Sequence, residues 1–340
     1  MKRSFFDKKP FLVADISANH CGNFQLAKKL ILEAKKNKVN AVKLQTYKPD
    51  SLTLKSDKKY FKLTKGLWKG SNLWKLYEKA QTPYEWHKEL FSYSKKIGIK
   101  IFSTPFDEDA VDFLEKLNCP AYKIASLEMQ HIDLLKKVAK TNKPIIISTG
   151  TFSLEEIEQT YDILSKFKPR DLTLLYCVSN YPSKLSDFNL NNIKILKDKF
   201  KCRVGLSDHS LDNSISSMAI AAGAEVIEKH IALQNQTKGP DIAFSLKGKE
   251  INQLKKQIDN TYKLLGKSFF YRSKSEKENI IHRRSIFISK NIKKGDRFTR
   301  KNIMVVRPGH GISPLYFNRI LNKKSPYNLK LGAPLSYKII

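Results

Sequence analysis

Two histidines of this chain stand near the ends of short apolar stretches. His209 follows "VGLSD" and His230 follows "VIEK", in consecutive β-rich segments around residues 202–208 and 225–231. If these segments are neighbouring parallel strands, both imidazoles project from the same edge of the sheet. Two imidazoles that leave coordination positions open suit a divalent metal such as Mn²⁺, which polarises a carbonyl group as a Lewis acid. Two separately hydrogen-bonded histidines are the alternative interpretation.

These histidines belong to a longer series of predicted strands. Eight β-rich segments alternate with amphipathic stretches and cover residues 11–17, 41–46, 100–105, 121–126, 144–149, 172–178, 202–208 and 225–231. Strands that alternate with helices predict a parallel sheet, and eight units favour a closed (β/α)₈ TIM barrel of the α/β class over an open doubly wound sheet. The first strand is not followed by a GxGxxG motif, which further weakens the open-sheet alternative.

Polar side chains follow all eight strands, at the edge where barrel enzymes carry their active sites. Lysines and short hydroxyls are suited to hold phosphate and carboxylate oxygens, and this set comprises Lys43, Thr104, Lys123, Ser126, Ser148, Ser179 and Ser207. The carboxylates are candidates for binding hydroxyls, activating water or orienting a histidine, and they comprise Asp15, Glu128, Asp208, Glu228 and Asp241. A buried lysine that forms a Schiff base with a carbonyl substrate is a competing mechanism.

The segments divide the chain into a catalytic barrel over 1–265, a linker over 266–281 and a small β-rich domain over 282–340. The linker is charged and lacks apolar periodicity, whereas short strands and Pro/Gly turns follow it. Residues 47–81 form an insertion after the second strand, rich in lysine and aromatic residues. The sequence leaves open whether this insertion is a lid or only a surface segment with its own small helix.

The formal net charge of +31 raises nucleic-acid binding as a function. The lysines, however, are spread over every predicted helix at positions that leave the apolar face intact, which is typical of solvated surfaces. We therefore expect no nucleic-acid partner, although a polyanion-binding protein remains an alternative.

No segment reaches the roughly 18 uninterrupted apolar residues of a membrane helix, and no signal peptide is indicated. The four cysteines show no CxxC pairing. These features predict a cytoplasmic protein without a membrane partner.

The motifs as a set resemble the sialic acid (nonulosonic acid) synthase family. They are "ADISANH", "AVKLQTY", "FSTPFD", "YKIAS", "ISTG", "GLSDHS", "IEKH" and "GPDIAFS", followed by "RRSIF" and "VVRPGHG". They occur in order over nearly the whole chain, and "KLQTY" and "GPDIAFSL" look most like the pseudaminic acid synthase branch. The resemblance implies a metal-dependent (β/α)₈ barrel joined to a C-terminal SAF (antifreeze-like) domain.

The resemblance also implies a reaction. Phosphoenolpyruvate condenses with an open-chain N-acetylated hexose and water, which yields phosphate and a nine-carbon acid. In the pseudaminate branch the acceptor is 2,4-diacetamido-2,4,6-trideoxy-L-altrose, and N-acetylneuraminate or legionaminate synthesis is the alternative. His209 and His230 would hold Mn²⁺ or Mg²⁺ against the sugar aldehyde.

Roles for further residues follow from the same resemblance. Phosphoenolpyruvate would be held by Lys43, Thr104, Lys123, Ser126, Ser148, Ser179 and Ser207, and the sugar by Gln45, Glu128, Tyr181 and Asp241. Asp15 or Glu228 would activate the attacking water. Arg307, in "VVRPG", matches an arginine that family members donate into the barrel of a partner subunit, which implies a domain-exchanged homodimer.

The sequence departs from the family pattern at two positions. Asp15 stands where the first-strand motif usually carries glutamate, so its carboxylate is withdrawn by one methylene and catalysis is predicted to weaken. Ser179 replaces the asparagine of neuraminate synthases, which fits the pseudaminate branch.

Overall fold

The computed structural model describes residues 5–7, 9–169 and 171–339, which form two compact units, Met1–Gly266 and Lys267–Ile340. The predicted boundaries of a three-part division, with a linker over 266–281, stay a prediction. That segment contains a short helix, α11 (Lys274–Glu278), whose N-terminus carries a capping box formed by Ser273 and Glu276. Each unit has its own buried apolar core.

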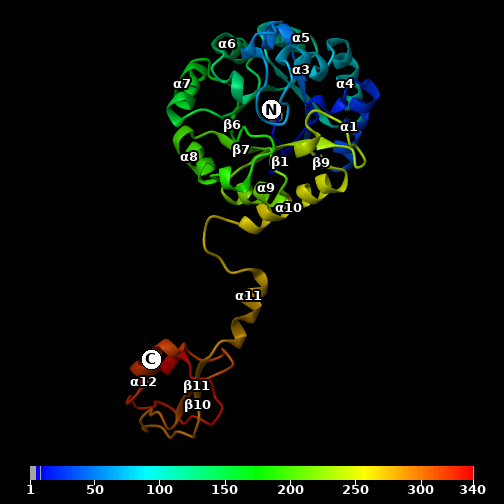
Figure 1. The fold of residues 1–340 in the computed structure, drawn as a ribbon. Coiled ribbons are helices and arrows are strands. Elements are labelled where there is room, and N and C mark those ends of the chain that lie inside the picture. Colours follow the sequence, from blue (N-terminus) through cyan, green and yellow to red (C-terminus); the bar gives the residue numbers. More distant parts are fainter. Residues whose placement is uncertain (1–4, 8, 170, 340) are drawn as a thin grey trace. The chain divides into compact units, whose positions relative to one another are not determined.

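The first unit is a closed parallel barrel, as predicted (Figure 1). Its strands are β1 (Phe11–Asp15), β2 (Ala41–Thr46), β3 (Lys100–Pro105), β4 (Tyr122–Ile124), β5 (Ile145–Ser148), β6 (Leu172–Cys177), β7 (Arg203–Asp208) and β8 (Val226–Ala232). Each strand pairs in parallel with the next, and β1 pairs with β8, which closes the sheet. The two-residue strand β9 (Leu246–Lys247) adds to β8 beyond the predicted eight.

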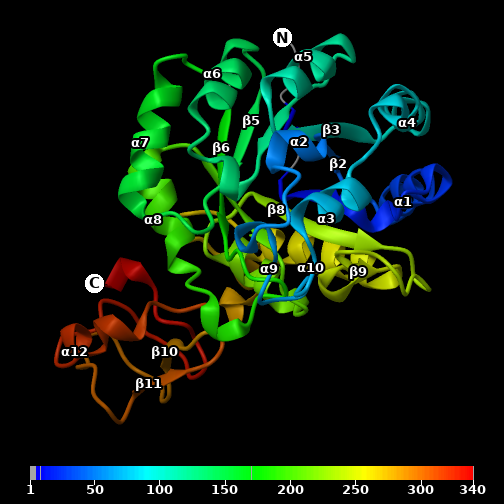
Figure 2. The same cartoon turned by 45° about the horizontal axis from the view of Figure 1, so that its top comes forward.

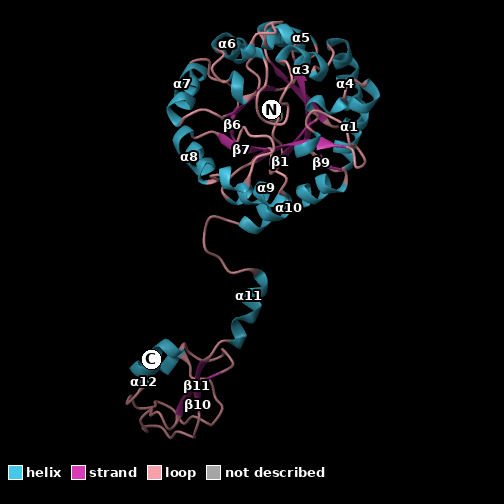
Figure 3. Cartoon of the chain, viewed as in Figure 1, coloured by secondary structure: helices cyan, strands magenta, loops and turns pink. Residues whose placement is uncertain are grey.

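Helices surround this ring of strands and cover its outer face (Figure 3). They are α1 (Phe24–Lys36), α4 (Tyr84–Ile97), α5 (Glu108–Lys116), α6 (Ile132–Lys140), α7 (Leu154–Ser165), α8 (Asn191–Phe200), α9 (Asn213–Ala221) and α10 (Lys249–Leu265). Each buries one apolar stripe; in α1 the stripe is Ala27, Leu30, Ile31 and Ala34, and its lysines are not among the buried residues. The predicted capping box of Ser153 and Glu156 begins α7.

The insertion after β2 contains α2 (Pro49–Leu52), the 3₁₀ turn η2 (Lys59–Phe61) and α3 (Leu73–Ala80). Residues of this segment line one cavity together with Gln45 of β2 and His230 of β8, and Figure 2 labels α2 and α3. Unlike the outer helices, α3 has no fully buried residue. Its apolar side chains are therefore partly exposed.

The second unit is built around a small antiparallel sheet of β10 (Ser285–Ile288) and β11 (Ile303–Val306), with the short helix α12 (Phe317–Ile320). Its core consists of Ile286, Ile288, Ile292, Phe298, Ile303, Ile312, Ile320 and Leu335. Among the described residues of the whole chain, no helix is both long enough and apolar enough to cross a bilayer.

Candidate active site

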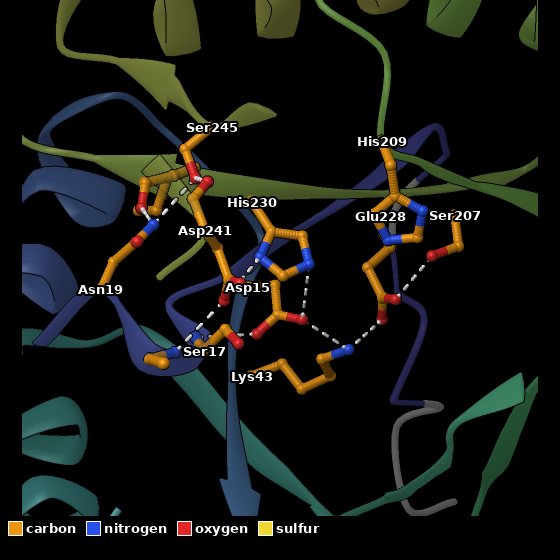
Figure 4. A network of polar contacts seen from close by, with 12 residues as sticks. Asp15, Ser17, Asn19, Lys43, Ser207, His209, Glu228, His230, Asp241 and Ser245 are labelled. Atoms are coloured by element: carbon orange, nitrogen blue, oxygen red, sulfur yellow. Dashed lines mark hydrogen bonds and ion pairs between the residues drawn. The ribbon is translucent and has the colours of Figure 1, made fainter. Parts of the chain in front are cut away.

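The register of the barrel brings polar side chains from four strands close together. Asp15 at the end of β1 is in register with Lys43 of β2 on one side and with His230 of β8 on the other. Ser207 of β7 is in register with Glu228 of β8. Because successive residues of a strand point to opposite faces, Glu228 and His230 lie on the same face. Figure 4 shows these side chains converging.

A buried ionic network joins them (Figure 4). Lys43 Nζ lies 2.8 Å from Asp15 Oδ2 and 3.0 Å from Glu228 Oε2. Lys123 Nζ lies 3.3 Å from Glu228 Oε1 and donates to Ser148 Oγ at 2.7 Å. Two lysines thus share two carboxylates with almost no exposure to solvent.

The two carboxylates of this network differ in their electrostatics. Burial tends to raise the pKa of Glu228, but Lys123 and Lys43 outweigh it and hold that pKa well below its usual range. Burial raises the pKa of Asp15, and its single close cation, Lys43, only partly opposes this effect. Glu228 is therefore the firmly ionised member, and Asp15 is the more basic one.

Both predicted histidines reach the same place. The ring centroids of His209 and His230 lie 5.3 Å apart. His209 Nδ1 lies 3.4 Å from the carbonyl oxygen of Val178, a partner that keeps the proton on Nδ1 and leaves the lone pair on Nε2. Burial lowers the pKa of His230 to about 4, so its imidazole is neutral near pH 7.

This arrangement fits a divalent metal. His230 Nδ1 is buried without a hydrogen-bond partner, although it lies 3.6 Å from Asp241 Oδ2. Two imidazoles whose ring centroids lie 5.3 Å apart are suitable ligands. Among the described residues, no group of three or more His, Cys, Asp or Glu side chains has the arrangement of a complete metal site.

The predicted hydroxyls lie on neighbouring strands. Thr104 Oγ1, on β3, is buried without a hydrogen-bond partner. Ser126 Oγ accepts a hydrogen bond from the backbone of Gly150 at 3.1 Å. A Cβ at Gly150 would lie only 2.1 Å from Ser179 Oγ, so the close packing of these hydroxyls requires glycine there.

A cavity of about 330 Å³ opens over the imidazole of His230. Its lining includes three of the predicted sugar-binding residues, Gln45, Tyr181 and Asp241. Glu128, the fourth, does not line this cavity; it is half-buried, and burial raises its pKa to about 7. Residues of the 47–81 insertion form a further part of the wall, together with Ser17, Ala18, Leu127, Pro240 and Phe244.

Two further polar residues singled out in the sequence have other surroundings within their own units. Arg307 belongs to the second unit, where it is exposed directly after β11. His20, one of the polar residues after the first strand, turns toward Thr82, with 3.3 Å between His20 Nε2 and Thr82 Oγ1. Burial lowers the pKa of His20 to about 4, and its edge packs on Trp86, so it is a core residue.

Three further residues of the site were not predicted from the sequence. The thiol of Cys177 lies 3.9 Å from His209 Nδ1; burial tends to raise its pKa, but His209 lowers it to about 7. Phe244 packs its ring 4.9 Å from that of His230. Trp68 of the insertion lines the cavity. Of these, only Trp68 carried a signal, because a tryptophan between two glycines in a lysine-rich insertion is unusual for a solvated loop.

A closed parallel barrel with imidazole and ionic side chains gathered at the carboxyl ends of its strands defines a (β/α)₈ enzyme. The NeuB family model matches residues 30–269, and the SAF domain model matches residues 283–338. The chain therefore belongs to the NeuB family, which confirms the predicted family and its two kinds of domain. Synthases of this family are generally metal-dependent.

Individual relatives are similar over nearly their full length. The pseudaminic acid synthase of Campylobacter jejuni serotype O:2 is 41% identical over 97% of this chain and 96% of that protein. The N,N'-diacetyllegionaminic acid synthase of the same organism is 39% identical over 95% of this chain and 98% of that protein. The crystal structure of the N-acetylneuraminic acid synthetase from Leptospira borgpetersenii superimposes with a TM-score of 0.73 at 33% identity, covering 80% of this chain and 90% of that one.

Proposed function

We propose that this NeuB-family enzyme is a pseudaminic acid synthase. It would condense phosphoenolpyruvate with 2,4-diacetamido-2,4,6-trideoxy-L-altrose and water to give pseudaminic acid and phosphate. The observation that carries the proposal is the buried network of Asp15, Lys43, Glu228 and Lys123 beside two facing imidazoles. The similarity to a pseudaminic acid synthase supports this acceptor, and the similarity to a legionaminic acid synthase supports the alternative diacetamido hexose.

The lysines and hydroxyls are suited to the three-carbon donor. Lys43 and Lys123 come from different strands, so they can contact the phosphate and carboxylate of one phosphoenolpyruvate molecule together with Ser126, Ser148, Ser179 and Ser207. Thr104 Oγ1 has its hydrogen-bonding capacity unused and would serve the same anion. Gln45, Tyr181 and Asp241 line the cavity in which the hexose would bind. Burial raises the pKa of the lining residue Tyr77, and Glu128 is close enough to its hydroxyl to raise that pKa further.

His209 and His230 are the residues that would hold Mn²⁺ or Mg²⁺, which when bound supplies Lewis acidity at the sugar aldehyde. The methylene carbon of the enol forms the new bond to the aldehyde carbon. Water then adds to the cationic carbon that carries the phosphate, and phosphate leaves from the resulting adduct.

Asp15 is the better candidate for the base that takes the proton from this water. Its pKa is raised by burial, whereas the pKa of Glu228 is held low by two lysines, and a weak base is a poor proton acceptor. Glu228 instead fixes the positions of both lysines and accepts a hydrogen bond from Ser207 at 2.9 Å. The shorter aspartate side chain is kept in place by the backbone N–H of Ser17, which donates to its Oδ1 at 2.9 Å.

Phosphate release from phosphoenolpyruvate tests the proposal. The acceptors are the L-altrose derivative, its legionaminate-type isomer and N-acetylmannosamine, each with and without a chelator. We expect chelator-sensitive release that is fastest with the L-altrose derivative. Release with N-acetylmannosamine alone would overturn the acceptor assignment, and chelator-resistant turnover with borohydride trapping on Lys123 would favour the Schiff-base mechanism.

The exposed Arg307 supports a further part of the proposal, a domain-exchanged homodimer in which each small domain completes a partner's barrel. An Arg307→Ala variant mixed with a barrel-inactive His230→Ala variant should recover part of the activity that each lacks alone. Without recovery, the arginine does not act between subunits.

The cytoplasmic location, where phosphoenolpyruvate is made, also remains a prediction.

A further inference from the structure

A loop of the insertion, residues 63–71, presents one side chain to the barrel. The ends of the loop are joined by backbone hydrogen bonds from Gly70 to Leu63 at 2.8 Å and from Leu63 to Ser71 at 2.9 Å. Trp68 is half-buried and lines the cavity, whereas the residues on either side of it are exposed. Because the loop is closed by its own backbone, we expect it to keep its shape when Trp68 is replaced.

Trp68 fastens the loop that follows β8. Its indole N–H donates to the carbonyl oxygen of Pro240 at 3.1 Å. The next residue, Asp241, has its Oδ2 3.6 Å from His230 Nδ1 (Figure 4), and the ring centroid of Phe244 lies 4.9 Å from that of His230. Since His230 Nδ1 makes no hydrogen bond, this loop supplies two of the neighbours that hold the imidazole in its orientation.

Trp68 also supports the second imidazole, through Tyr181. The ring centroid of Tyr181 lies 5.7 Å from that of Trp68 and 4.5 Å from that of His209. Aromatic rings at such distances attract each other. Tyr181 also packs on Phe244, with 5.3 Å between the ring centroids. Trp68 is therefore connected to the two imidazoles by separate routes, one through a hydrogen bond and one through ring packing.

We propose that Trp68 is a positioning residue that holds His209 and His230 in the mutual arrangement that binds a divalent cation. This inference rests on the proposed function, because it takes these two histidines as the metal ligands. Groups behind a ligand raise metal affinity when they fix the ligand beforehand, since less freedom is then lost on binding. The insertion after β2 is thus a clamp on the cation site that acts through one side chain.

Two substitutions of Trp68 separate the two routes. Trp68→Phe keeps a ring against Tyr181 and loses the donor to Pro240, whereas Trp68→Leu loses both contacts. Residues that support a metal ligand from behind are typically worth about 10- to 100-fold in affinity. We expect Trp68→Leu to weaken Mn²⁺ binding about 10-fold. Trp68→Phe should weaken it about 3-fold, because one neutral hydrogen bond contributes less than both supports together.

Trp74→Leu is the matched control. Trp74 belongs to α3 of the same insertion and is half-buried like Trp68. Its indole N–H has no hydrogen-bond partner, and it is not among the described residues that line the cavity. Removal of this second tryptophan should therefore leave the Mn²⁺ affinity of the native protein unchanged.

Calorimetric titration with Mn²⁺, without substrates, measures the affinity of each full-length protein. Steady-state phosphate release supplies a second readout. At limiting Mn²⁺ the rate of Trp68→Leu should fall, and about 10-fold more Mn²⁺ should restore kcat, because the defect lies in cation affinity. The KM for phosphoenolpyruvate should stay native, since neither Lys43 nor Lys123 is among the described residues that line the cavity with Trp68.

The outcomes separate this inference from the proposed function. If Trp68→Leu binds Mn²⁺ with native affinity, the inference is wrong, while the proposed ligands stand as long as His230→Ala abolishes binding. A raised KM for the acceptor at native Mn²⁺ affinity would also overturn it, because Trp68 would then contact the sugar.

A native protein that binds no Mn²⁺ would refute the ligand assignment of the proposed function and the inference with it. Circular dichroism checks that each variant is folded. Were Trp68→Leu to unfold, the loss of affinity in Trp68→Phe would decide the question alone.

Discussion

Replacement of Glu228 and of Asp15 by their amides should have very different effects on the stability of the barrel. Glu228 makes contacts with Lys43, Lys123 and Ser207, at 3.0, 3.3 and 2.9 Å. Glu228→Gln leaves Lys123 without a carboxylate partner and Lys43 with only Asp15, all in a fully buried site. Loss of one member of a buried ionic cluster costs about 3–5 kcal/mol, because the remaining charge is left uncompensated.

Asp15→Asn should cost less than about 1 kcal/mol. Lys43 keeps its contact with Glu228, and the pKa of Asp15 is already raised, so its ionised form is not strongly stabilised in the folded protein. Asp15→Asn should nevertheless abolish phosphate release, because it removes the proposed base from a protein that stays stably folded.

Urea unfolding at pH 7 measures both effects. All three tryptophans, Trp68, Trp74 and Trp86, lie in the first unit, so the fluorescence change reports the unfolding of the barrel alone. The slope of the free energy of unfolding with urea should be the same for all variants, which allows their midpoints to be compared. Equal losses of stability in Glu228→Gln and Asp15→Asn would refute the assignment of Glu228 as the firmly ionised centre of the network.

Three further predictions concern neighbouring residues. Replacing His209 or His230 by Ala should abolish chelator-sensitive phosphate release and Mn²⁺ binding in titration calorimetry, while the circular dichroism stays native; retained Mn²⁺ binding would contradict the ligand assignment. The folded pKa of Glu128, about 7, exceeds its unfolded value of 4.5, so the native state holds its proton longer and stability falls as pH rises between these values. Glu128→Gln should therefore flatten urea midpoints measured across that window, and an unchanged slope would show that Glu128 is not the group responsible. Gly150→Ala should destabilise the barrel and weaken phosphoenolpyruvate binding, because its Cβ would lie 2.1 Å from Ser179 Oγ, and Ser179→Gly in the same chain should restore stability; failure of this rescue would place the strain elsewhere.

The barrel could be predicted because each strand is apolar on both faces and each helix on one. Ile145, Ile146 and Ile147 of β5 are all buried, which is the pattern of a strand covered by helices outside and by the barrel core inside. A chain with eight repeats of this strand–helix pattern can adopt only a few sheet topologies. The small strand β9 was not predictable, since two residues carry no periodicity.

The candidate residues could be predicted as a set, but their partners could not. Lys43 and Lys123 were expected to hold an anion, and in the structure they are already paired with Glu228 and Asp15. That pairing depends on register between β1, β2 and β8, which the sequence of one strand does not contain. His20 shows the same limit, because its contacts with Trp86 and Thr82, more than 60 residues away in the chain, cannot be read from its own strand.

The alternation of residues along β7 and β8 explains why an acid and a base accompany the two histidines. On β8, Lys229 directly precedes His230, so the two side chains occupy opposite faces of the strand. Asp208 is the last residue of β7 and directly precedes His209. Lys229 Nζ lies 2.9 Å from Asp208 Oδ2 and donates to the carbonyl oxygen of Ser210 at 2.6 Å.

This second buried ion pair ties the ends of the two strands together. Asp208 also accepts hydrogen bonds from Ser210 and from Ser216 of α9, both at 2.6 Å. The strand ends that carry the imidazoles are thus fixed to each other and to the helix layer by groups that do not enter the site. Such support sets the distance between the two proposed ligands before a metal binds, which is the condition for a site with few protein ligands to retain a defined geometry.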